Sequence, residues 1–548
     1  MSRILIVGGV AGGATAAARL RRLNEQAEII MFERGEHISF ANCGLPYYIG
    51  GAIPEREDLL LQTPDSFRRR FNVDVRVLCE VTSLDIDAKT VSVTDLRTGE
   101  SYTQGYDTLI LSPGGAPIKP PIEGIDSERV FTLRNVADID CIKGYITKAS
   151  PKNAVVVGGG FIGIEMAENL IEAGLNVSIV ELSDQVLAPF DIDMACDVHK
   201  YLRQKGVSLC LGNGLQSIKE RGGALTVMLS NGELDADLVI LAIGVKPESQ
   251  LARDAGLDVN GRGGIVVDKY MRTSDPNIYA VGDAVEIADF VTGVASQFPL
   301  AGPANKQARI AANNICNMPC EFSGVQGSAV VKVFDMTAAC TGVNEKSARR
   351  LGLNYDKVFL WSPGHAGYYP GSMPMSIKVI FDKVSGKILG AQIVGFQGVD
   401  KRCDVLAVAI RAGMTAFDLT ELELCYAPPF SSAKDPVNMA GYLIDNVLSG
   451  VVKNFHWHDV EGLPRDGSVT LLDVRTPYEV RHGHIEGFFN IPVDDLRGRI
   501  GELDISRPVY VHCQVGVRSY IAARILMQCG FSVYNLSGGY RLYSAING

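Results

Sequence analysis

A glycine-rich turn between a buried strand and a helix occurs twice in this chain, and this repeat constrains the fold more than any other feature. The first copy is RILIV (3–7) followed by GGVAGGATAAARLRRL, with the turn glycines Gly8, Gly12 and Gly13. The second is AVVVGGGFIGIEMAENL, with the turn glycines Gly158, Gly160 and Gly163 in full GxGxxG spacing. Such turns let the backbone approach a phosphate while the helix directs its positive N-terminal end at it. The repeat predicts two nucleotide-binding α/β units in series.

Each copy is followed, about twenty residues later, by a strand that ends in an acid. AEIIMFE ends in Glu33, and the strand in NVSIVEL ends at Glu181. A carboxylate at this position accepts hydrogen bonds from a ribose. In the second copy it favours the 2′-hydroxyl of NADH and repels the 2′-phosphate of NADPH. In the first copy Val10 stands where the pattern has its second glycine, so this copy departs from the consensus.

Two further segments complete a recognisable set. NIYAVGDAVE places Asp283 after a strand, and TLILSPGGAPIKP (108–120) is a crossover turn. With these segments the chain resembles the pyridine nucleotide–disulfide oxidoreductase family from residue 1 to about 450. The resemblance implies that the first unit binds FAD through Gly8, Ala11, Gly12, Gly13, Glu33, Arg34, Asn42, Ser112, Pro113, Gly114, Asp283 and Ala301. It implies that the second unit, inserted into the first, binds the nicotinamide dinucleotide through Gly158, Gly160, Phe161, Ile162, Gly163, Glu181 and Gly244.

The segment SFANCGLPYYIGG (39–51) contains one cysteine, Cys43, and the next cysteine is Cys79. Glutathione-reductase-like members carry a CxxxxC pair and a C-terminal His–Glu dyad, which this chain lacks. Peroxidase and oxidase members carry a histidine where Val10 stands. The segments around Cys43, HAGYYPG and CYAPPFSSAKDPVN resemble coenzyme A–disulfide reductases and NADH-dependent persulfide reductases. The resemblance implies that Cys43 bonds an external thiol, the sulfur of coenzyme A.

Protonation of a leaving sulfur requires an acid, and a tyrosine is the candidate when no histidine is present. The sequence offers Tyr368 or Tyr369 in GHAGYYPG and Tyr426 in LCYAPPF. Each of these could instead be an ordinary interface tyrosine. The resemblance favours Tyr368 and Tyr426, which would reach the active site of the other subunit in a homodimer.

A coenzyme A site also needs groups that bind anions. Thr15, Arg19 and Arg22 share one face of the first helix. By resemblance they line the coenzyme A channel together with Ser39, Asn42 and Cys43, and Lys434 joins them from the partner chain. Relatives have a phosphate-binding lysine near position 71, where this chain has Phe71 after three arginines.

The last part of the chain has a pattern of its own. VTLLDVRTPYEVRHGHIEGFFNIP and PVYVHCQVGVRSYIAARIL resemble a rhodanese domain over residues 461–548. Its loop from Cys513 to Arg518 follows a strand and opens a helix, so backbone N–H groups and the helix dipole favour a thiolate. The C-x4-R spacing is shorter than the C-x5-R of phosphatase loops, which hold a larger phosphate. We therefore predict an active sulfurtransferase with Cys513 and Arg518 as catalytic residues.

We predict six segments: an FAD-binding domain in two parts (1–115 and 245–324), an NAD(P)H-binding domain (116–244), an α+β dimerisation domain (325–450), a polar linker (451–460) and an α/β rhodanese domain (461–548). The net charge of −10 argues against nucleic-acid binding. The scattered cysteines, with no CxxC pair, and the absence of a signal-peptide pattern favour a cytoplasmic protein without a disulfide framework. We expect no membrane span and no metal site.

The expected function is reduction of coenzyme A disulfide, coenzyme A persulfide or polysulfide by NADH, coupled to the rhodanese domain. Two alternatives remain open. One is an NADH oxidase in which Cys43 cycles through sulfenic acid. The other is a sulfur carrier or redox sensor that does not turn over at Cys43.

Overall fold

The computed structural model describes residues 2–547, which form two compact units. The first unit contains the residues up to Val186 and Gly206–Val325, and the second contains Leu187–Lys205 and the residues from Gln326 onward. Among the described residues, no helix is both long enough and apolar enough to span a bilayer.

A parallel sheet carries the first glycine turn, with strand order β19-β7-β1-β2-β3. Its inner strands read as continuous apolar runs because both of their faces are covered. Strand β1 pairs with β2 on one side and β7 on the other, so a crevice opens where the strand order reverses. The elements are β1 (Arg3–Val7), β2 (Glu28–Glu33), β3 (Asp74–Val77), β7 (Thr108–Leu111), β19 (Ile278–Ala280), α1 (Ala11–Leu23), α3 (Pro64–Phe71) and α8 (Ala301–Ile315).

Two small antiparallel or mixed sheets extend this domain. One contains β4 (Cys79–Asp85), β5 (Thr90–Asp95) and β6 (Ser101–Gly105), and the other contains β18 (Ile265–Val266), β20 (Val285–Ala288) and β21 (Ala295–Ser296). The short helix α7 (Gln250–Asp254) packs against β4.

The second parallel sheet has the order β12-β11-β10-β16-β9, and its strands lie in the chain between β7 and β19. The chain leaves the first parallel sheet through β8 (Gly115–Pro117) and returns through β17 (Val245–Pro247), and these two strands pair as an antiparallel ribbon. The remaining elements are β9 (Val130–Thr132), β10 (Asn153–Val157), β11 (Asn176–Val180), β12 (Ser208–Cys210), β13 (Leu215–Arg221), β14 (Ala224–Leu229), β15 (Glu233–Ala236), β16 (Leu238–Leu241), α4 (Val136–Ala149) and α5 (Phe161–Glu172).

The second unit begins with an antiparallel sheet of order β22-β23-β26-β25-β24. Helix α6 (Ile192–Gln204) lies in the range predicted for the NAD(P)H-binding domain but packs on this sheet, so it belongs to this unit. The elements are β22 (Ala329–Val333), β23 (Met336–Gly342), β24 (Tyr355–Pro363), β25 (Pro374–Asp382), β26 (Ile388–Gly395), α9 (Glu345–Arg350), α10 (Val399–Ala412), α11 (Ala416–Glu421) and α12 (Pro436–Leu448).

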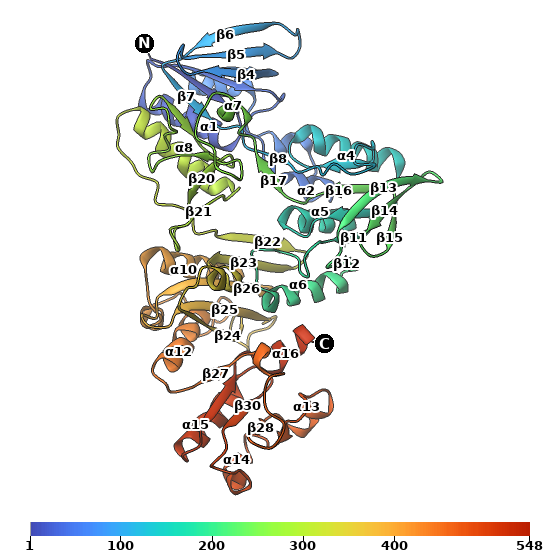
Figure 1. Cartoon of the computed structure of the whole chain (residues 1–548), viewed down its shortest axis with the longest axis vertical. Helices are drawn as coiled ribbons and strands as arrows, with labels where there is room; N and C mark the ends of the chain where they lie inside the picture. Colours follow the sequence, from blue (N-terminus) through green and yellow to red (C-terminus); the bar gives the residue numbers. More distant parts are fainter. Residues whose placement is uncertain (1, 548) are drawn as a thin grey trace. The chain divides into compact units, whose positions relative to one another are not determined.

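The C-terminal domain, red in Figure 1, is built on a parallel sheet of order β27-β31-β30-β28-β29. Strand β27 (Asn454–Phe455) lies in the segment predicted as a linker, yet it pairs with β31, so that segment contributes to the sheet. Two residues are too short a strand to leave a pattern in the sequence. The other elements are β28 (Thr470–Asp473), β29 (Phe489–Asn490), β30 (Val509–His512), β31 (Val533–Leu536), α13 (Pro477–Arg481), α14 (Leu496–Arg499), α15 (Val517–Gln528) and α16 (Gly539–Asn547).

A buried charge cluster organises the second unit. The ammonium group of Lys378, on β25, is fully buried and lies 3.0 Å from Asp191, 2.9 Å from Asp193 and 2.7 Å from Glu345. Burial opposes the charge of Lys378, but the three carboxylates outweigh burial and raise its pKa. Because Asp191 immediately precedes α6 and Asp193 lies in its first turn, the cluster fastens α6 to the sheet.

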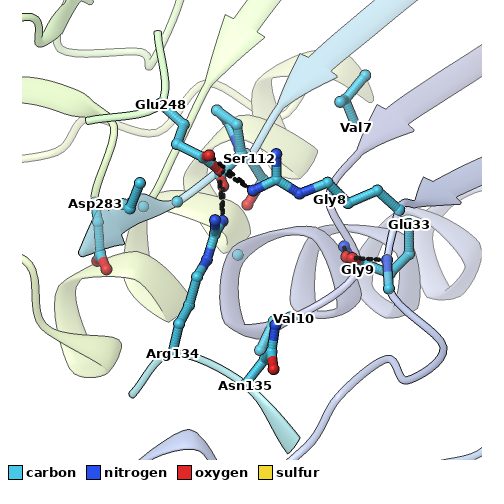
Figure 2. A pocket seen from close by; sticks show the side chains of 18 of the residues that line it. Val7, Gly8, Gly9, Val10, Glu33, Ser112, Arg134, Asn135, Glu248 and Asp283 are labelled. Carbon is cyan, nitrogen blue, oxygen red and sulfur yellow. Dashed lines mark hydrogen bonds and ion pairs between the residues drawn. The ribbon is translucent and has the colours of Figure 1, made fainter. Parts of the chain in front are cut away.

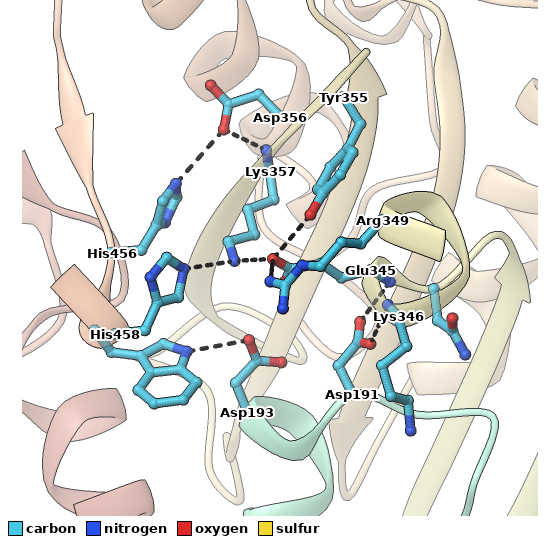
Figure 3. A network of polar contacts seen from close by, with 12 residues as sticks. Asp191, Asp193, Glu345, Lys346, Arg349, Tyr355, Asp356, Lys357, His456 and His458 are labelled. Carbon is cyan, nitrogen blue, oxygen red and sulfur yellow. Dashed lines mark hydrogen bonds and ion pairs between the residues drawn. The ribbon is translucent and has the colours of Figure 1, made fainter. Parts of the chain in front are cut away.

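The segment that leads into the C-terminal domain also contacts this cluster (Figure 3). Trp457 donates its indole N–H to Asp193 Oδ2 at 3.3 Å, and His458 Nε2 lies 3.3 Å from the Nζ of Lys357. Lys357 in turn donates to Glu345 at 2.5 Å. Specific polar contacts therefore hold the C-terminal domain against the antiparallel sheet β22-β23-β26-β25-β24.

We predict that Lys378→Met destabilises this unit by about 3–5 kcal/mol, because three buried carboxylates lose their shared cation. Both tryptophans of the chain, Trp361 and Trp457, lie in this unit, so tryptophan fluorescence during urea unfolding measures the effect. The matched control is Lys205→Met, whose ion pair with Asp335 is solvent-exposed and whose loss should change little. Equal unfolding midpoints for both variants would contradict the role assigned to Lys378.

Candidate active site

A cavity of about 1080 Å³ opens at the C-terminal ends of β1 and β2 (Figure 2). Of the residues that the resemblance assigned to FAD, all except Gly13 and Ala301 line this cavity. Gly13 lies behind the turn, where a Cβ atom would come within 1.8 Å of the carbonyl oxygen of Gly8. Ala301 is the exposed first residue of α8, and its neighbour Ala304 lines the cavity instead.

The first glycine turn leaves room for a ligand rather than for side chains. Gly8 has φ +97°, and a Cβ atom there would lie 2.0 Å from the carbonyl oxygen of Ser112. Helix α1 starts at this turn with no side-chain hydrogen bond at its N-cap, Val10, and no acid in its first turn. Its first N–H groups have no side-chain partner there, which is the arrangement that binds a phosphate.

The acids that follow the two turns have the same environment. Glu33 accepts hydrogen bonds from the backbone N–H groups of Gly9 and Gly35, both at 2.8 Å. Glu181 accepts them from Gly159 at 2.7 Å and Ser183 at 2.8 Å. Each carboxylate is thus held at the tip of its strand beside the glycine turn. The two glycine-turn segments share this geometry although their sequences differ.

A charged triad crosses the cavity, and two of its members carried no sequence motif. Glu248 accepts hydrogen bonds from Arg34 at 2.6 Å and from Arg134 at 2.5 Å. Burial works against ionisation of Glu248, but the two arginines outweigh it and lower the pKa. Asp283 lies across the cavity, where burial raises its pKa and Arg134 partly offsets the shift. Arg134 and Glu248 follow short strands with no distinctive pattern, so only the fold reveals them.

The second glycine turn repeats the features of the first. Gly158 has φ +108°, and a Cβ atom on Gly163 would lie 1.9 Å from the carbonyl oxygen of Gly158. Helix α5 begins at Phe161 without a side-chain cap, next to the exposed Ile162. A Cβ atom on Gly160 would meet nothing within 4 Å, so the space in front of this turn is open. Gly244, at φ +117°, follows the neighbouring strand β16.

These features fit two dinucleotides. The uncapped helix ends would receive the pyrophosphates, and Glu33 and Glu181 would receive the riboses. When bound, FAD supplies two-electron chemistry between a nicotinamide and a sulfur centre.

Cys43 lies on a short 3-10 helix, Asn42–Gly44, that leads into α2 (Leu45–Ile49). The residue is exposed, and its neighbour Asn42 lines the cavity. Partial burial of the thiol, followed by the charges of Glu165 and Asp283, raises the pKa of Cys43. All twelve cysteines of the chain are free, so no intramolecular disulfide occupies Cys43.

The structure separates the two candidate tyrosines of the GHAGYYPG segment. The hydroxyl of Tyr368 lies 3.0 Å from that of Tyr426, and both side chains are exposed. This hydrogen bond raises the pKa of Tyr368. Tyr369 packs edge-on against His365 instead. The structure thus pairs the two tyrosines that the resemblance favoured.

The residues assigned to coenzyme A have mixed environments. Thr15 and Arg19 face α8, where Arg19 donates to Asn313 at 3.0 Å, while Arg22 is exposed. Ser39 donates its N–H to the carbonyl of Gly9, and Lys434 is exposed in the second unit. Phe71 packs on Phe67 with ring centroids 4.7 Å apart, so its partly buried ring lies against the core.

In the C-terminal domain the sulfur of Cys513 is held from several sides. The residue is fully buried, and its Sγ accepts hydrogen bonds from the N–H of Gly516 at 3.1 Å and the hydroxyl of Ser519 at 3.3 Å. Helix α15 starts next to it without a side-chain cap at Gly516. Ser519 was not among the predicted site residues, although it directly follows Arg518 on the same helix.

Arg518 does not donate to the sulfur of Cys513. Its guanidinium forms a two-pronged ion pair with Glu479 at 2.6 and 2.7 Å. This hydrogen bonding lowers the pKa of Glu479 to about 2. Glu479 also accepts from Thr476 at the start of α13, so Arg518 braces the wall of the loop. The sequence contains Glu479 in the first rhodanese-like segment, but its distance of 39 residues from Arg518 concealed the pair.

Three family models match the chain. "Pyridine nucleotide-disulphide oxidoreductase" matches residues 2–308, its dimerisation domain matches residues 328–436, and "Rhodanese-like domain" matches residues 457–546.

Curated relatives and solved structures agree with these models. Coenzyme A disulfide reductase of Staphylococcus haemolyticus is 38% identical over 81% of this chain and 99% of its own length. An NADH oxidase of Methanocaldococcus jannaschii is 38% identical over 80% of this chain and 97% of its own length.

Among solved structures, reduced CoADR-RHD of Bacillus anthracis is 50% identical with a TM-score of 0.97, covering 100% of this chain and 98% of that one. An NAD-dependent persulfide reductase of A. fulgidus is 38% identical with a TM-score of 0.92, covering 99% and 100%. The chain therefore belongs to the pyridine nucleotide–disulphide oxidoreductase family, whose enzymes use FAD and NADH, and it carries a rhodanese-like domain at its C-terminal end.

Proposed function

We propose that this enzyme uses NADH and bound FAD to reduce coenzyme A disulfide, coenzyme A persulfide or polysulfide through Cys43. The observation that carries the proposal is the position of Cys43. It is an exposed, free cysteine whose neighbour lines the FAD-sized cavity, and the charge of Asp283 from that cavity acts on its thiol. A cysteine in this position can attack a sulfur outside the chain. Electrons that arrive from the cavity side can then regenerate its thiolate.

The reaction balances with one NADH for each sulfur–sulfur bond. For a persulfide, NADH, one proton and CoA–S–SH give NAD⁺, CoA–SH and H₂S. The Cys43 thiolate attacks one sulfur and forms a mixed disulfide, and the leaving sulfur takes up a proton. Two electrons from NADH then break the mixed disulfide and regenerate the thiolate of Cys43. The paired hydroxyls of Tyr368 and Tyr426 of the partner subunit are our candidates for the proton donor.

The rhodanese-like domain supplies the sulfur in this proposal. Cys513 has a preformed site for a thiolate or persulfide, and its domain contacts β24, the strand that precedes the loop of Tyr368. Strand β24 contacts the C-terminal domain through Phe359 and Trp361, and the loop after β24 carries Tyr368. A cytoplasmic location, where thiols remain reduced, is consistent with the free cysteines.

An NADH oxidase is the second candidate, and the oxidase relative supports it. In that reaction Cys43 would cycle through sulfenic acid, with oxygen as the oxidant. Val10 lines the cavity at the position where oxidase members carry a histidine, so the acid–base group expected of that branch is missing. We therefore favour sulfur substrates.

We predict that Cys43→Ser abolishes NADH-dependent reduction of coenzyme A disulfide and polysulfide while FAD remains bound. The serine hydroxyl is not ionised near neutral pH and cannot replace the thiolate. Anaerobic NADH consumption measures turnover, and flavin absorbance measures FAD content. The control is Cys141→Ser, another exposed cysteine, which should retain wild-type turnover. Near wild-type turnover in Cys43→Ser would disprove the proposed mechanism.

The donor preference is predicted to depend on Glu181. NADH should have the higher kcat/KM, and Glu181→Gln should reduce the preference over NADPH by roughly tenfold, because repulsion of the 2′-phosphate disappears. Glu172→Gln, an exposed change on α5, is the control and should leave the ratio unchanged. A wild-type preference for NADPH would show that Glu181 has a different role.

The shared-site proposal predicts complementation between two inactive variants. When Cys43→Ser and Tyr426→Phe dimers exchange subunits, each heterodimer should contain one complete site. Random mixing gives about half heterodimers with one working site of two, so roughly a quarter of wild-type activity should return. Activity of the mixture, compared with each parent, measures the recovery.

Two results would contradict the shared-site proposal. Nearly full activity of Tyr426→Phe alone would make the tyrosine structural. Verified heterodimers without recovery would show that each tyrosine serves the cysteine of its own chain.

A further inference from the structure

A partly buried hydrogen bond near Cys43 in the chain has no role in the chemistry described so far. Tyr47, on α2, donates its hydroxyl hydrogen to Oε1 of Glu165, on α5, at 3.2 Å. Tyr47 follows Cys43 by four residues, and the 3-10 helix of Cys43 leads directly into α2. One helical turn therefore connects the cysteine to this bond.

The two helices that carry the pair are in close contact. Gly50, at the end of α2, faces Asn169 of α5 so closely that a Cβ atom would lie 2.3 Å from its Oδ1. Asn169 in turn donates to the carbonyl oxygen of Glu165 at 2.8 Å. The distance between Tyr47 and Glu165 is thus set by the packing of α2 on α5.

We propose that Tyr47 and Glu165 are positioning residues that control the ionisation of Cys43, with Glu165 giving up its charge when the Cys43 thiolate forms. The proposal rests on the redox role of Cys43 proposed above. The charge of Glu165 acts on the Cys43 thiol from the helix that Tyr47 contacts, and two negative charges in one partly desolvated site oppose each other. A proton on Glu165 would therefore favour the thiolate that attacks the sulfur substrate.

The charges around the pair support this assignment. Burial raises the pKa of Glu165, the hydrogen bond from Tyr47 partly offsets this and the charge of Glu168 adds to it, so the pKa is raised to about 7. Burial raises the pKa of Cys43, and Glu165 and Asp283 add to the shift. Burial, the charge of Glu165 and the bond to it raise the pKa of Tyr47, so it remains a hydrogen-bond donor.

Among the described residues of α4, the helix on the other side of α2, no cation contacts Tyr47 or Glu165. Helix α4 also packs against α2, and its Lys143 is directed to the backbone carbonyl of Tyr48 and the ring of Tyr48. Of the described residues, Tyr47 and Glu168 act on Glu165, and Glu165 and Asp283 act on Cys43.

The sign of the effect follows from these charges. As pH rises through about 7, Glu165 ionises, and its charge then hinders loss of the proton from Cys43. Replacing Glu165 by a neutral residue removes that hindrance. Removing the Tyr47 hydroxyl keeps Glu165 protonated to higher pH, because the carboxylate loses a hydrogen bond that stabilises it.

The test measures alkylation of Cys43 in the FAD-loaded enzyme as a function of pH, with peptide mass spectrometry to separate Cys43 from the other exposed cysteines. In Glu165→Gln the alkylation profile should move to lower pH by about one unit. Tyr47→Phe should move it by less in the same direction. Glu172→Gln, on the same helix but exposed, should match the wild type.

Coinciding profiles for Glu165→Gln, Glu172→Gln and the wild type would overturn the proposal. If Glu165→Gln loses FAD, Tyr47→Phe decides the question, and an unshifted profile in that variant has the same meaning. Since alkylation needs no sulfur substrate, failure of this proposal is distinguishable from a wrong substrate.

Discussion

Close contact between helix and strand at the two glycine turns is the constraint on which the rest of the first unit depends. A Cβ atom at Gly13 or Gly163 would overlap a backbone carbonyl at less than 2 Å. Because the helices sit this close, their uncapped N-termini open directly at the strand ends. The acids that end β2 and β11 then reach back to the same turns. The uncapped helix ends and the acids that could bind a dinucleotide therefore meet at each turn.

The second unit depends on charge rather than on glycine. The buried ammonium of Lys378 is compensated by carboxylates from α6 and from the start of α9. Such a cluster is strongly destabilised by removal of one member, and this requirement holds its elements in one arrangement. The entry to the rhodanese-like domain joins this cluster through Trp457 and His458. The sulfur site of Cys513 and the tyrosine pair are therefore carried by one compact unit.

Much of the fold was predictable because its signals are local in the chain. The two glycine turns, the strand that precedes Asp283 and the strand–loop–helix around Cys513 each lie within about thirty residues. Ser519 apart, the pairs in the sites that the sequence did not reveal join residues far apart in the chain. Glu248 meets Arg134 across 114 residues, Arg518 meets Glu479 across 39, and Tyr47 meets Glu165 across 118. Such long-range pairs leave no repeating pattern in the sequence.

The sequence by itself determined the family, the order of domains and the presence of a single cysteine in the segment 39–51. It did so because glycine turns and the C-x4-R loop require particular residues at short, fixed spacings. Only the tertiary structure decided which charges surround that cysteine, that Arg518 braces a loop wall, and that Tyr368 rather than Tyr369 pairs with Tyr426. Those outcomes depend on burial and on distances between elements, and both arise only when the helices and sheets pack together.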